Sequence, residues 1–171
     1  MKITLKLAKL SDLPLLKYWN KKPHVIFATG GDSQDEDTWL EDQLKEPSEF
    51  VWIWIAIQDD KQIGVAQIVD PANEETHYWG EVEQGLRAID IWISEETDLG
   101  KGYGTQMMNL ALAKCFDDDS VKAAIIDPLV VNTRAIKFYQ TIGFTFVENR
   151  HFDDDYCAIY RMDRKRWQNR E

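Results

Sequence analysis

The spacing of apolar residues divides the chain into short strands and helices. Residues 3–7 alternate between apolar and polar side chains, which predicts a first strand. Start signals and apolar spacing then predict helices in "SDLPLLKYWN" (11–20) and "DEDTWLEDQLK" (35–45). Two apolar, β-branched and aromatic runs at 50–58 and 62–70 flank a "DDK" turn, an arrangement typical of a β-hairpin.

The second half of the chain contains a strand–helix–strand unit followed by a helix and two strands. Asn132 is placed to cap the second of these helices and Gly143 to end it, with apolar side chains on one face between them. The order of elements is typical of an α/β protein with a mixed sheet, in which the strand–helix–strand unit joins two parallel strands. The expected elements are a strand at 85–94, a helix at 104–116, a strand at 121–128, the capped helix, and strands at 144–149 and 156–162.

Three glycines at alternate positions stand between a predicted strand and a predicted helix: Gly100, Gly102 and Gly104. Glycine permits positive φ angles and close approach of a ligand, and a helix start carries unpaired N–H groups and positive potential. Phosphate is a natural ligand of such a turn, although a glycine turn can also serve only to connect two elements. The pattern is not a P-loop, because Lys101 is followed by glycine. It is not a dinucleotide fingerprint either, because Thr105 stands where a third glycine is required.

Two segments, "LGKGYGT" (99–105) and "NTRAIKFYQTIGF" (132–144), resemble the acetyl-CoA signatures of the GNAT superfamily of N-acetyltransferases. The first is similar to the Arg/Gln-x-x-Gly-x-Gly/Ala loop of that family, with Leu99 in place of the usual Arg or Gln. With "GLRAIDIWI" (85–93), these segments resemble the aminoglycoside 6′-N-acetyltransferases, which also tend to carry leucine there. The resemblance implies a single N-acetyltransferase domain over residues 1–171. It also implies a GNAT-like α/β fold: a mixed, mostly antiparallel sheet with helices on both faces and a splayed parallel strand pair.

Asp90 and Tyr139 are the expected catalytic residues. Asp90 interrupts an isoleucine-rich strand, and such a conflict with β preference is typical of functional positions; a solvent-facing or ion-paired aspartate is the alternative. The resemblance implies that Asp90 binds the substrate ammonium and accepts its proton, directly or through a water. It also implies that Tyr139 hydrogen-bonds or protonates the departing CoA thiolate. Tyr139 falls on the apolar face of its helix, so a plain core role is its alternative.

The resemblance also assigns residues to acetyl-CoA and to the acceptor. Backbone N–H groups of Ile91–Ile93 are expected to stabilise the carbonyl oxygen as it gains charge. Lys101 and Arg134 are expected to add positive charge near the phosphates, with a solvated surface role as the alternative. The expected acceptor contact from the resemblance is Asp127, at the end of a strand, with a plain Asp-Pro turn as the alternative; Glu83 and Trp79 are weaker candidates because they lie in the acidic segment at 70–84. The expected acetyl-CoA contacts are Ile91, Trp92, Ile93, Leu99, Gly100, Lys101, Gly102, Tyr103, Gly104, Thr105, Asn132, Arg134 and Ala135.

The net charge of −10 favours a cationic partner. A negative surface repels nucleic acid and anionic lipid and attracts small polycations, and the acidic residues gather at 30–49 and 70–84, where a solvated face is the alternative. Cys115 and Cys157 are too few for a disulfide framework, and neither they nor the three histidines are spaced for a metal, so none is expected. No apolar run reaches the roughly 20 residues of a membrane span. The opening segment also lacks the apolar stretch of a signal peptide, which favours the cytoplasm and argues against a membrane partner.

The sequence thus predicts an enzyme that moves an acetyl group from acetyl-CoA, its co-substrate, to a primary amine of a cationic small molecule. The 6′-amine of an aminoglycoside is the leading acceptor. The alternatives are an acyltransferase of siderophore biosynthesis, a polyamine or protein N-acetyltransferase, and a CoA-binding sensor without activity. A siderophore enzyme typically pairs its aspartate with a histidine, which the Asp90 strand lacks, and a sensor is expected to lack the Asp90 and Tyr139 groups. Monomer and homodimer both stay open.

Overall fold

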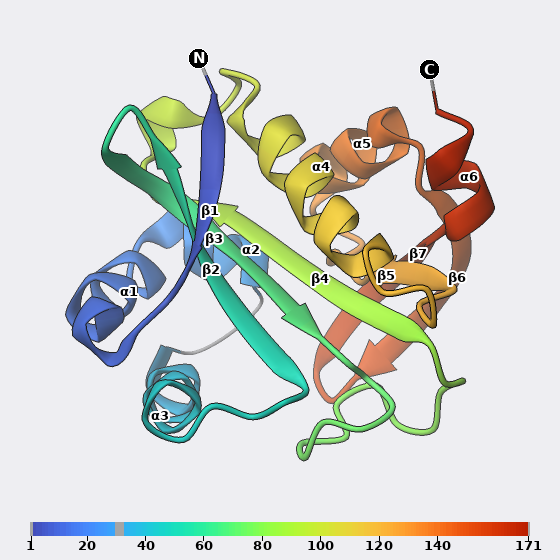
Figure 1. The fold of residues 1–171 in the computed structure, drawn as a ribbon, viewed down its shortest axis with the longest axis horizontal. Helices are drawn as coiled ribbons and strands as arrows, with labels where there is room; N and C mark the ends of the chain where they lie inside the picture. The colour runs from blue at the N-terminus through green and yellow to red at the C-terminus, as the bar shows by residue number, and fades with distance from the viewer. Residues whose placement is uncertain (1, 30–32, 171) are drawn as a thin grey trace.

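The computed structural model describes residues 2–29 and 33–170 and is built around one seven-stranded sheet (Figure 1). The order of strands across the sheet is β1-β2-β3-β4-β5-β7-β6, which confirms the predicted mixed α/β fold. Residues 30–32, at the start of the first acidic segment, lie outside the described residues. In chain order the strands are β1 (Ile3–Leu7), β2 (Val51–Gln58), β3 (Lys61–Val69), β4 (Leu86–Ile93), β5 (Ala123–Ile126), β6 (Thr145–Phe152) and β7 (Asp155–Asp163).

The helices of the described chain include four that the sequence pattern predicts and two that it does not, α2 and α6. α2 has one buried residue, Val25, so it lacks the apolar stripe by which a helix is recognised. The one residue in its sequence that is typical of a helix start is Pro23, at the first position. α6 is five residues long, too short for a helical period to show. The helices are α1 (Leu13–Asn20), α2 (Pro23–Thr29), α3 (Ser33–Lys45), α4 (Tyr103–Phe116), α5 (Thr133–Ile142) and α6 (Arg164–Gln168), with 3₁₀ turns at Leu10–Asp12 and Glu96–Asp98.

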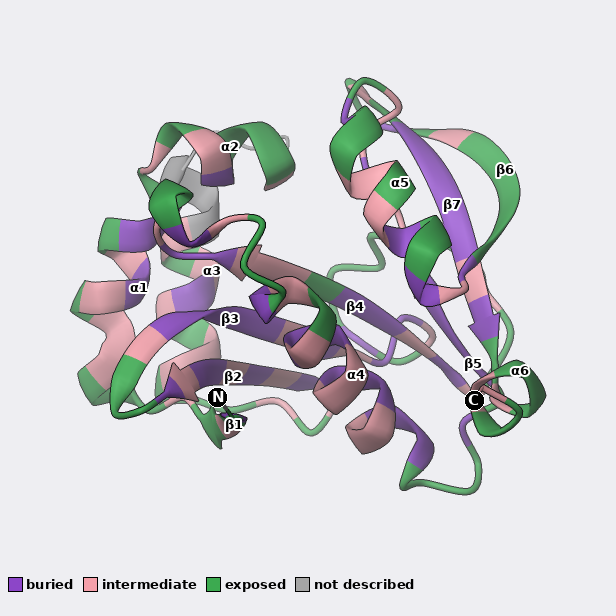
Figure 2. Ribbon diagram, turned by 90° about the horizontal axis from the view of Figure 1, so that it is seen from above, coloured by how far each residue is buried: buried purple, intermediate pink, exposed green. Residues whose placement is uncertain are grey.

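Different helices bury the two faces of the sheet, because neighbouring residues of a strand point to opposite sides. Val65 of β3 packs in one cluster with Leu16 of α1 and Leu40 of α3, whereas the next residue, Ala66, packs in another cluster with Met108 of α4. Complete burial of a leucine or methionine side chain stabilises the fold by about 1.5–3 kcal/mol. Figure 2 shows buried residues along β2, β3 and β7, while the edge strand β6 is mostly exposed. Helices therefore lie on both faces, as predicted.

β4 and β5 are the parallel pair of the described sheet, and they separate before β4 ends. Their register runs from Leu86 opposite Ala123 to Ala88 opposite Ile125, whereas β4 continues to Ile93. Beyond Ala88, β4 keeps its antiparallel partner β3 on one side and has no β5 residue paired on the other. The predicted splay is confirmed, and it leaves a gap at the carboxyl ends of two strands, where α/β sheets bind ligands. No helix in the described part of the chain is long and apolar enough to cross a membrane.

Candidate active site

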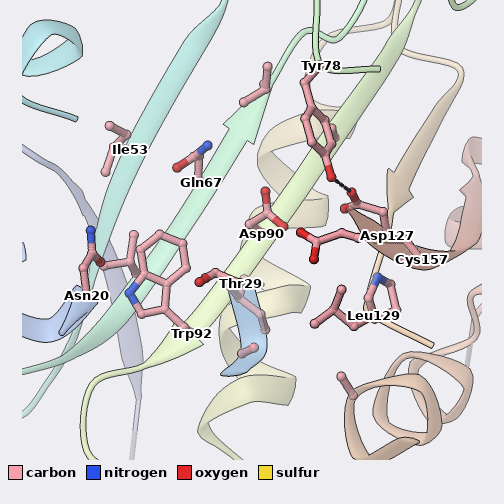
Figure 3. A pocket seen from close by; sticks show the side chains of 18 of the residues that line it. Asn20, Thr29, Ile53, Gln67, Tyr78, Asp90, Trp92, Asp127, Leu129 and Cys157 are labelled. Carbon is pink, nitrogen blue, oxygen red and sulfur yellow. Dashed lines mark hydrogen bonds between the residues drawn. The ribbon is translucent and has the colours of Figure 1, made fainter. Parts of the chain in front are cut away.

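The gap between β4 and β5 opens into a cavity of about 570 Å³. Its walls come from strands β2, β3, β4 and β7, from residues 127–129 after β5, from helices α1, α2, α3 and α5, and from the loop at 70–85. Figure 3 shows Tyr78 and Asp127 meeting on one side of Asp90, with Gln67 and Trp92 on the other. The cavity therefore brings together polar groups from segments that are far apart in the chain.

Asp90 faces this cavity from the middle of β4. Strand alternation places its neighbour Ile89 in the core, 1% exposed, and leaves the Asp90 side chain exposed on the opposite face. The residue opposite Asp90 on β3 is Gln67, which also lines the cavity. The carboxylate that conflicts with local β preference is thus tolerated because it faces the cavity, where it can bind an ammonium group.

Asp127 follows the last residue of β5 and is held by a residue that the sequence analysis did not identify, Tyr78. The Tyr78 hydroxyl donates a hydrogen bond of 2.7 Å to Oδ2 of Asp127 (Figure 3). Burial raises the pKa of the Asp127 carboxyl above its usual range, and the negative charge of Asp155 acts in the same direction, while the Tyr78 hydrogen bond lowers it. Asp155 also lines the cavity, so its carboxylate shares the cavity with those of Asp90 and Asp127.

Tyr139 combines the two roles that the sequence left open, core and cavity. Its ring is buried and packs at 5.1 Å from Phe138 and 5.8 Å from Phe144 between ring centroids, yet the residue also lines the cavity. Burial raises its pKa above the ordinary value near 10, and the charges of Asp90 and Asp127 raise it further. The phenol therefore stays protonated at neutral pH and can act as a hydrogen-bond donor.

The glycine turn is open to solvent at Gly100 and Gly102. Gly100 and Gly102 have φ angles of +80° and +81°, and a Cβ added at either would meet nothing within 4 Å. Gly102 is the N-cap of α4, whose first N–H groups have no partner within the helix. A Cβ on Gly104 would lie 3.3 Å from the ring of Phe138, so glycine here allows α4 and α5 to pack closely. The turn has the free N–H groups and the space that a diphosphate requires.

The side chains around the glycine turn differ in their surroundings. The ammonium group of Lys101 lies 2.7 Å from Oδ1 of Asp98, and that of Lys61 lies 2.8 Å from Oδ2, so one carboxylate is shared by two positive charges. Both hydrogen bonds lower the pKa of the Asp98 carboxyl, and the one from Lys101 has the larger effect. Tyr103 is buried in the core and Leu99 packs beside it, so their backbone rather than their side chains faces a ligand. Two further expected contacts have exposed side chains, Thr105 at the start of α4 and Arg134 on α5.

The remaining expected acetyl-CoA residues lie around the splay. Asn132 caps α5 by accepting a 3.1 Å hydrogen bond from the N–H of Ala135, and both residues line the cavity. Ile91 and Trp92 line it as well, whereas the Ile93 side chain is buried in the core. The Ile93 carbonyl accepts a hydrogen bond of 2.9 Å from Nε2 of the α2 residue His24, which ties α2 to the end of β4. His24 lies half-buried in this helix.

The structure separates the two weaker acceptor candidates. Trp79 is buried, lines the cavity and packs edge-on against Phe152 at 5.2 Å between ring centroids. Glu83 is absent from the described residues that line the cavity, and it accepts a 2.7 Å hydrogen bond from Arg161 of β7. The loop at 70–85 therefore directs Tyr78 and Trp79 inward and Glu83 elsewhere. Within residues 2–29 and 33–170 no group of three or more His, Cys, Asp or Glu residues is arranged to hold a metal ion.

Both cysteines are free thiols with raised pKa values. Cys157 of β7 lines the cavity, and Cys115 of α4 is buried in the core. Burial raises the pKa of each thiol to about 12. Neither side chain is therefore a nucleophile at neutral pH.

Comparison with known proteins gives matches over most of the chain. Residues 9–152 match the Acetyltransferase (GNAT) domain family. Over 149 residues the chain is 30% identical to aminoglycoside N(6′)-acetyltransferase type 1 of Klebsiella pneumoniae, an alignment that covers 83% of this chain and 73% of that protein. Aminoglycoside acetyltransferase AAC(6′)-Ib in complex with coenzyme A has a similar fold, with a TM-score of 0.87, 26% identity and 98% coverage of both chains. The same enzyme with ribostamycin and coenzyme A gives a TM-score of 0.88 at 27% identity, covering 99% of this chain and 97% of that one.

Proposed function

Because the chain belongs to the GNAT acetyltransferase family, we propose that it acetylates the 6′-amine of an aminoglycoside with acetyl-CoA as the acetyl donor. The family assignment confirms the resemblance drawn from the glycine turn and the Asn132 helix. One observation carries the proposal: the open glycine turn packs through Gly104 against α5, the helix that brings Tyr139 into the cavity faced by Asp90. The proposal takes residues 1–171 as one catalytic domain.

Acetyl-CoA fits the residues at the splay. The free backbone N–H groups between Gly100 and Thr105 suit its diphosphate, and the group formed by Lys61, Asp98 and Lys101 leaves one positive charge beside them. Beyond Ala88, β4 has no partner on the side of β5, so its backbone groups on that side face the gap. We assign N–H groups of Ile91–Ile93 to the thioester carbonyl oxygen. When bound, acetyl-CoA supplies an activated acetyl group.

Asp90 and Tyr139 are assigned complementary roles in the transfer. An amine is protonated at neutral pH and becomes a nucleophile only after losing that proton, so Asp90 binds the ammonium group and accepts the proton, directly or through a water. Tyr139 donates a hydrogen bond to the sulfur as negative charge develops on it. Its raised pKa favours this donor role over complete transfer of the phenolic proton.

The cavity carries charges that suit a polycationic acceptor. Asp127 and Asp155 line it beside Asp90, and the whole chain has a net charge of −10. Asp127 and Asp155 are assigned to ammonium groups of the acceptor that do not react, so that binding at several points fixes which amine meets Asp90. Relatives with solved structures support this class of acceptor, because AAC(6′)-Ib has been solved with ribostamycin and with kanamycin.

The regiochemistry of the reaction tests the proposal. Neomycin and paromomycin share one scaffold and differ at the 6′ position, where neomycin has an amine and paromomycin a hydroxyl. Release of CoA thiol is expected with neomycin and kanamycin and not with paromomycin. Turnover with spermidine or a lysine peptide but with no aminoglycoside would move the acceptor class to polyamines or proteins. Binding of CoA without turnover of any amine would contradict an enzymatic function.

Gly102→Ala is expected to weaken binding of acetyl-CoA by roughly tenfold, equivalent to about 1.4 kcal/mol. A methyl group at φ +81° strains the turn and stands in the open space assigned to the phosphates. Calorimetric titration with CoA measures the change. Gly80→Ala is a matched control, because Gly80 also has a positive φ, +66°, and open space around it but lies in another loop. An equal loss of CoA affinity in both variants would contradict a phosphate role for the turn.

A further inference from the structure

Tyr78 reaches Asp127 across 49 residues of sequence. It belongs to the loop between β3 and β4, whereas Asp127 follows β5, and the two hydrogen-bonded residues both line the cavity (Figure 3). The preceding residue, His77, has a φ of +50°, a conformation that a non-glycine residue adopts only where its surroundings impose it. The loop is thus folded into the shape that aims the Tyr78 hydroxyl at the carboxylate.

Two sets of contacts hold Tyr78 in place. Its ring stacks on Phe152 with 4.5 Å between centroids and an angle of 10°, and it meets Trp79 edge-on at 5.9 Å. Its backbone N–H donates a 3.0 Å hydrogen bond to Glu74, whose other carboxylate oxygen accepts the N–H of Thr76 at 2.6 Å. Glu74 is 4% exposed, so this anchor is itself part of the core. Folding has already ordered the hydroxyl, so acceptor binding does not have to order it.

The hydroxyl acts on the Asp127 carboxylate in two ways. A hydrogen bond from a neutral donor stabilises the ionised form against the desolvation that burial imposes. It also occupies Oδ2 and fixes the orientation of the group, while a carboxylate keeps further acceptor positions for an incoming ammonium. Asp155 cannot replace this effect, because its negative charge favours protonation of Asp127.

We propose that Tyr78 is a positioning residue for acceptor recognition, whose hydroxyl holds the Asp127 carboxylate ready for a non-reacting ammonium group of a polycationic aminoglycoside. The inference rests on the proposed function, because it takes Asp127 as part of the acceptor site. Tyr78 acts through Asp127 and stands on the acceptor side of Asp90. Its contribution is therefore to acceptor affinity, and not to acetyl-CoA binding or to proton transfer.

Tyr78→Phe removes the hydroxyl and keeps the stacked ring. The KM for kanamycin is expected to rise about tenfold, because a hydrogen bond to a charged group is lost, while kcat and the KM for acetyl-CoA stay unchanged. Calorimetric titration of paromomycin into the CoA complex is expected to show the same loss of affinity without any turnover. A fall in kcat with an unchanged acceptor KM would overturn the proposal.

A double-mutant cycle separates positioning from a purely structural role. In an Asp127→Asn background, Tyr78→Phe is expected to add no further change in acceptor affinity, because its target charge is gone. A matched control is Tyr156→Phe, since Tyr156 is similarly exposed, stacks on His151 and is absent from the described cavity lining. An effect of Tyr78→Phe that persists in the Asp127→Asn background would overturn the proposal. If Asp127→Asn itself leaves acceptor affinity unchanged, the assignment of Asp127 fails instead.

Discussion

Asp90→Asn is expected to lower kcat for acetylation of kanamycin by about 10²–10⁴-fold, the range that a general base contributes. The substitution keeps the shape of an exposed side chain at the cavity, so the fold is expected to persist. Because the amide cannot accept the ammonium proton, the amine stays protonated and does not attack. Steady-state release of CoA thiol measures the change, and titration with CoA is expected to give an unchanged affinity.

Asp163→Asn provides the comparison for this prediction. Asp163 is also an aspartate of a strand, β7, but it is exposed and stands outside the described cavity lining. Its substitution is expected to leave kcat within about twofold of the original value, as is usual for surface positions. An Asp90→Asn variant that turns over at a similar rate would remove Asp90 from the mechanism and leave the bound amine without a base.

Tyr139→Phe is expected to lower kcat by about 10- to 100-fold, because the transition state loses one hydrogen bond to a charged group. The ring contacts with Phe138 and Phe144 are kept, so the substitution tests the hydroxyl alone. Tyr160→Phe is the matched control, because Tyr160 is equally buried in the same core cluster and receives a hydrogen bond from Gln140 without lining the cavity. If both variants keep full activity, Tyr139 has only a core role.

The pH profile gives a second readout for Tyr139. Burial and the neighbouring carboxylates raise the phenol pKa above its ordinary value near 10, so Tyr139 remains protonated between pH 6 and about 9. Its substitution is therefore expected to lower the whole profile of kcat against pH in this range without moving either limb. A basic limb that is present in the original enzyme and absent in Tyr139→Phe would show instead that the phenol titrates within the assay range.

The parts of the fold that follow local rules could be predicted from the sequence. Asn132 caps its helix and Gly143 ends it with a φ of +109°, because both signals depend on a few neighbouring residues. Asp90 could be singled out because a carboxylate among isoleucines breaks a local preference, and the strand places it in the cavity. α2 and α6 could not be predicted, since neither is long enough or amphipathic enough to show a period.

The contacts of the loops depend on tertiary structure and could not be read from spacing. Tyr78 stood beside the predicted Trp79, but nothing in its neighbours indicates that it meets a residue 49 positions away. Glu83 was favoured by the acidic character of its segment, yet it is paired with Arg161, 78 positions away. Lys101 matched a phosphate-binding loop by sequence, although the nearby Asp98 holds its ammonium group. The contacts of Tyr78 and Glu83 require knowing which segments meet, and motif spacing does not encode that.

The two sequestered sulfhydryl groups have a practical consequence for studying this enzyme. Aromatic disulfide reagents react with thiolates. Because the thiols of Cys115 and Cys157 have a pKa of about 12, almost none of either is in the thiolate form at pH 7 to 8. The colour produced in a coupled assay therefore originates from the free coenzyme and not from the native protein. A slow additional signal would report opening of the structure around these two positions, so a single reagent can follow both turnover and conformational integrity.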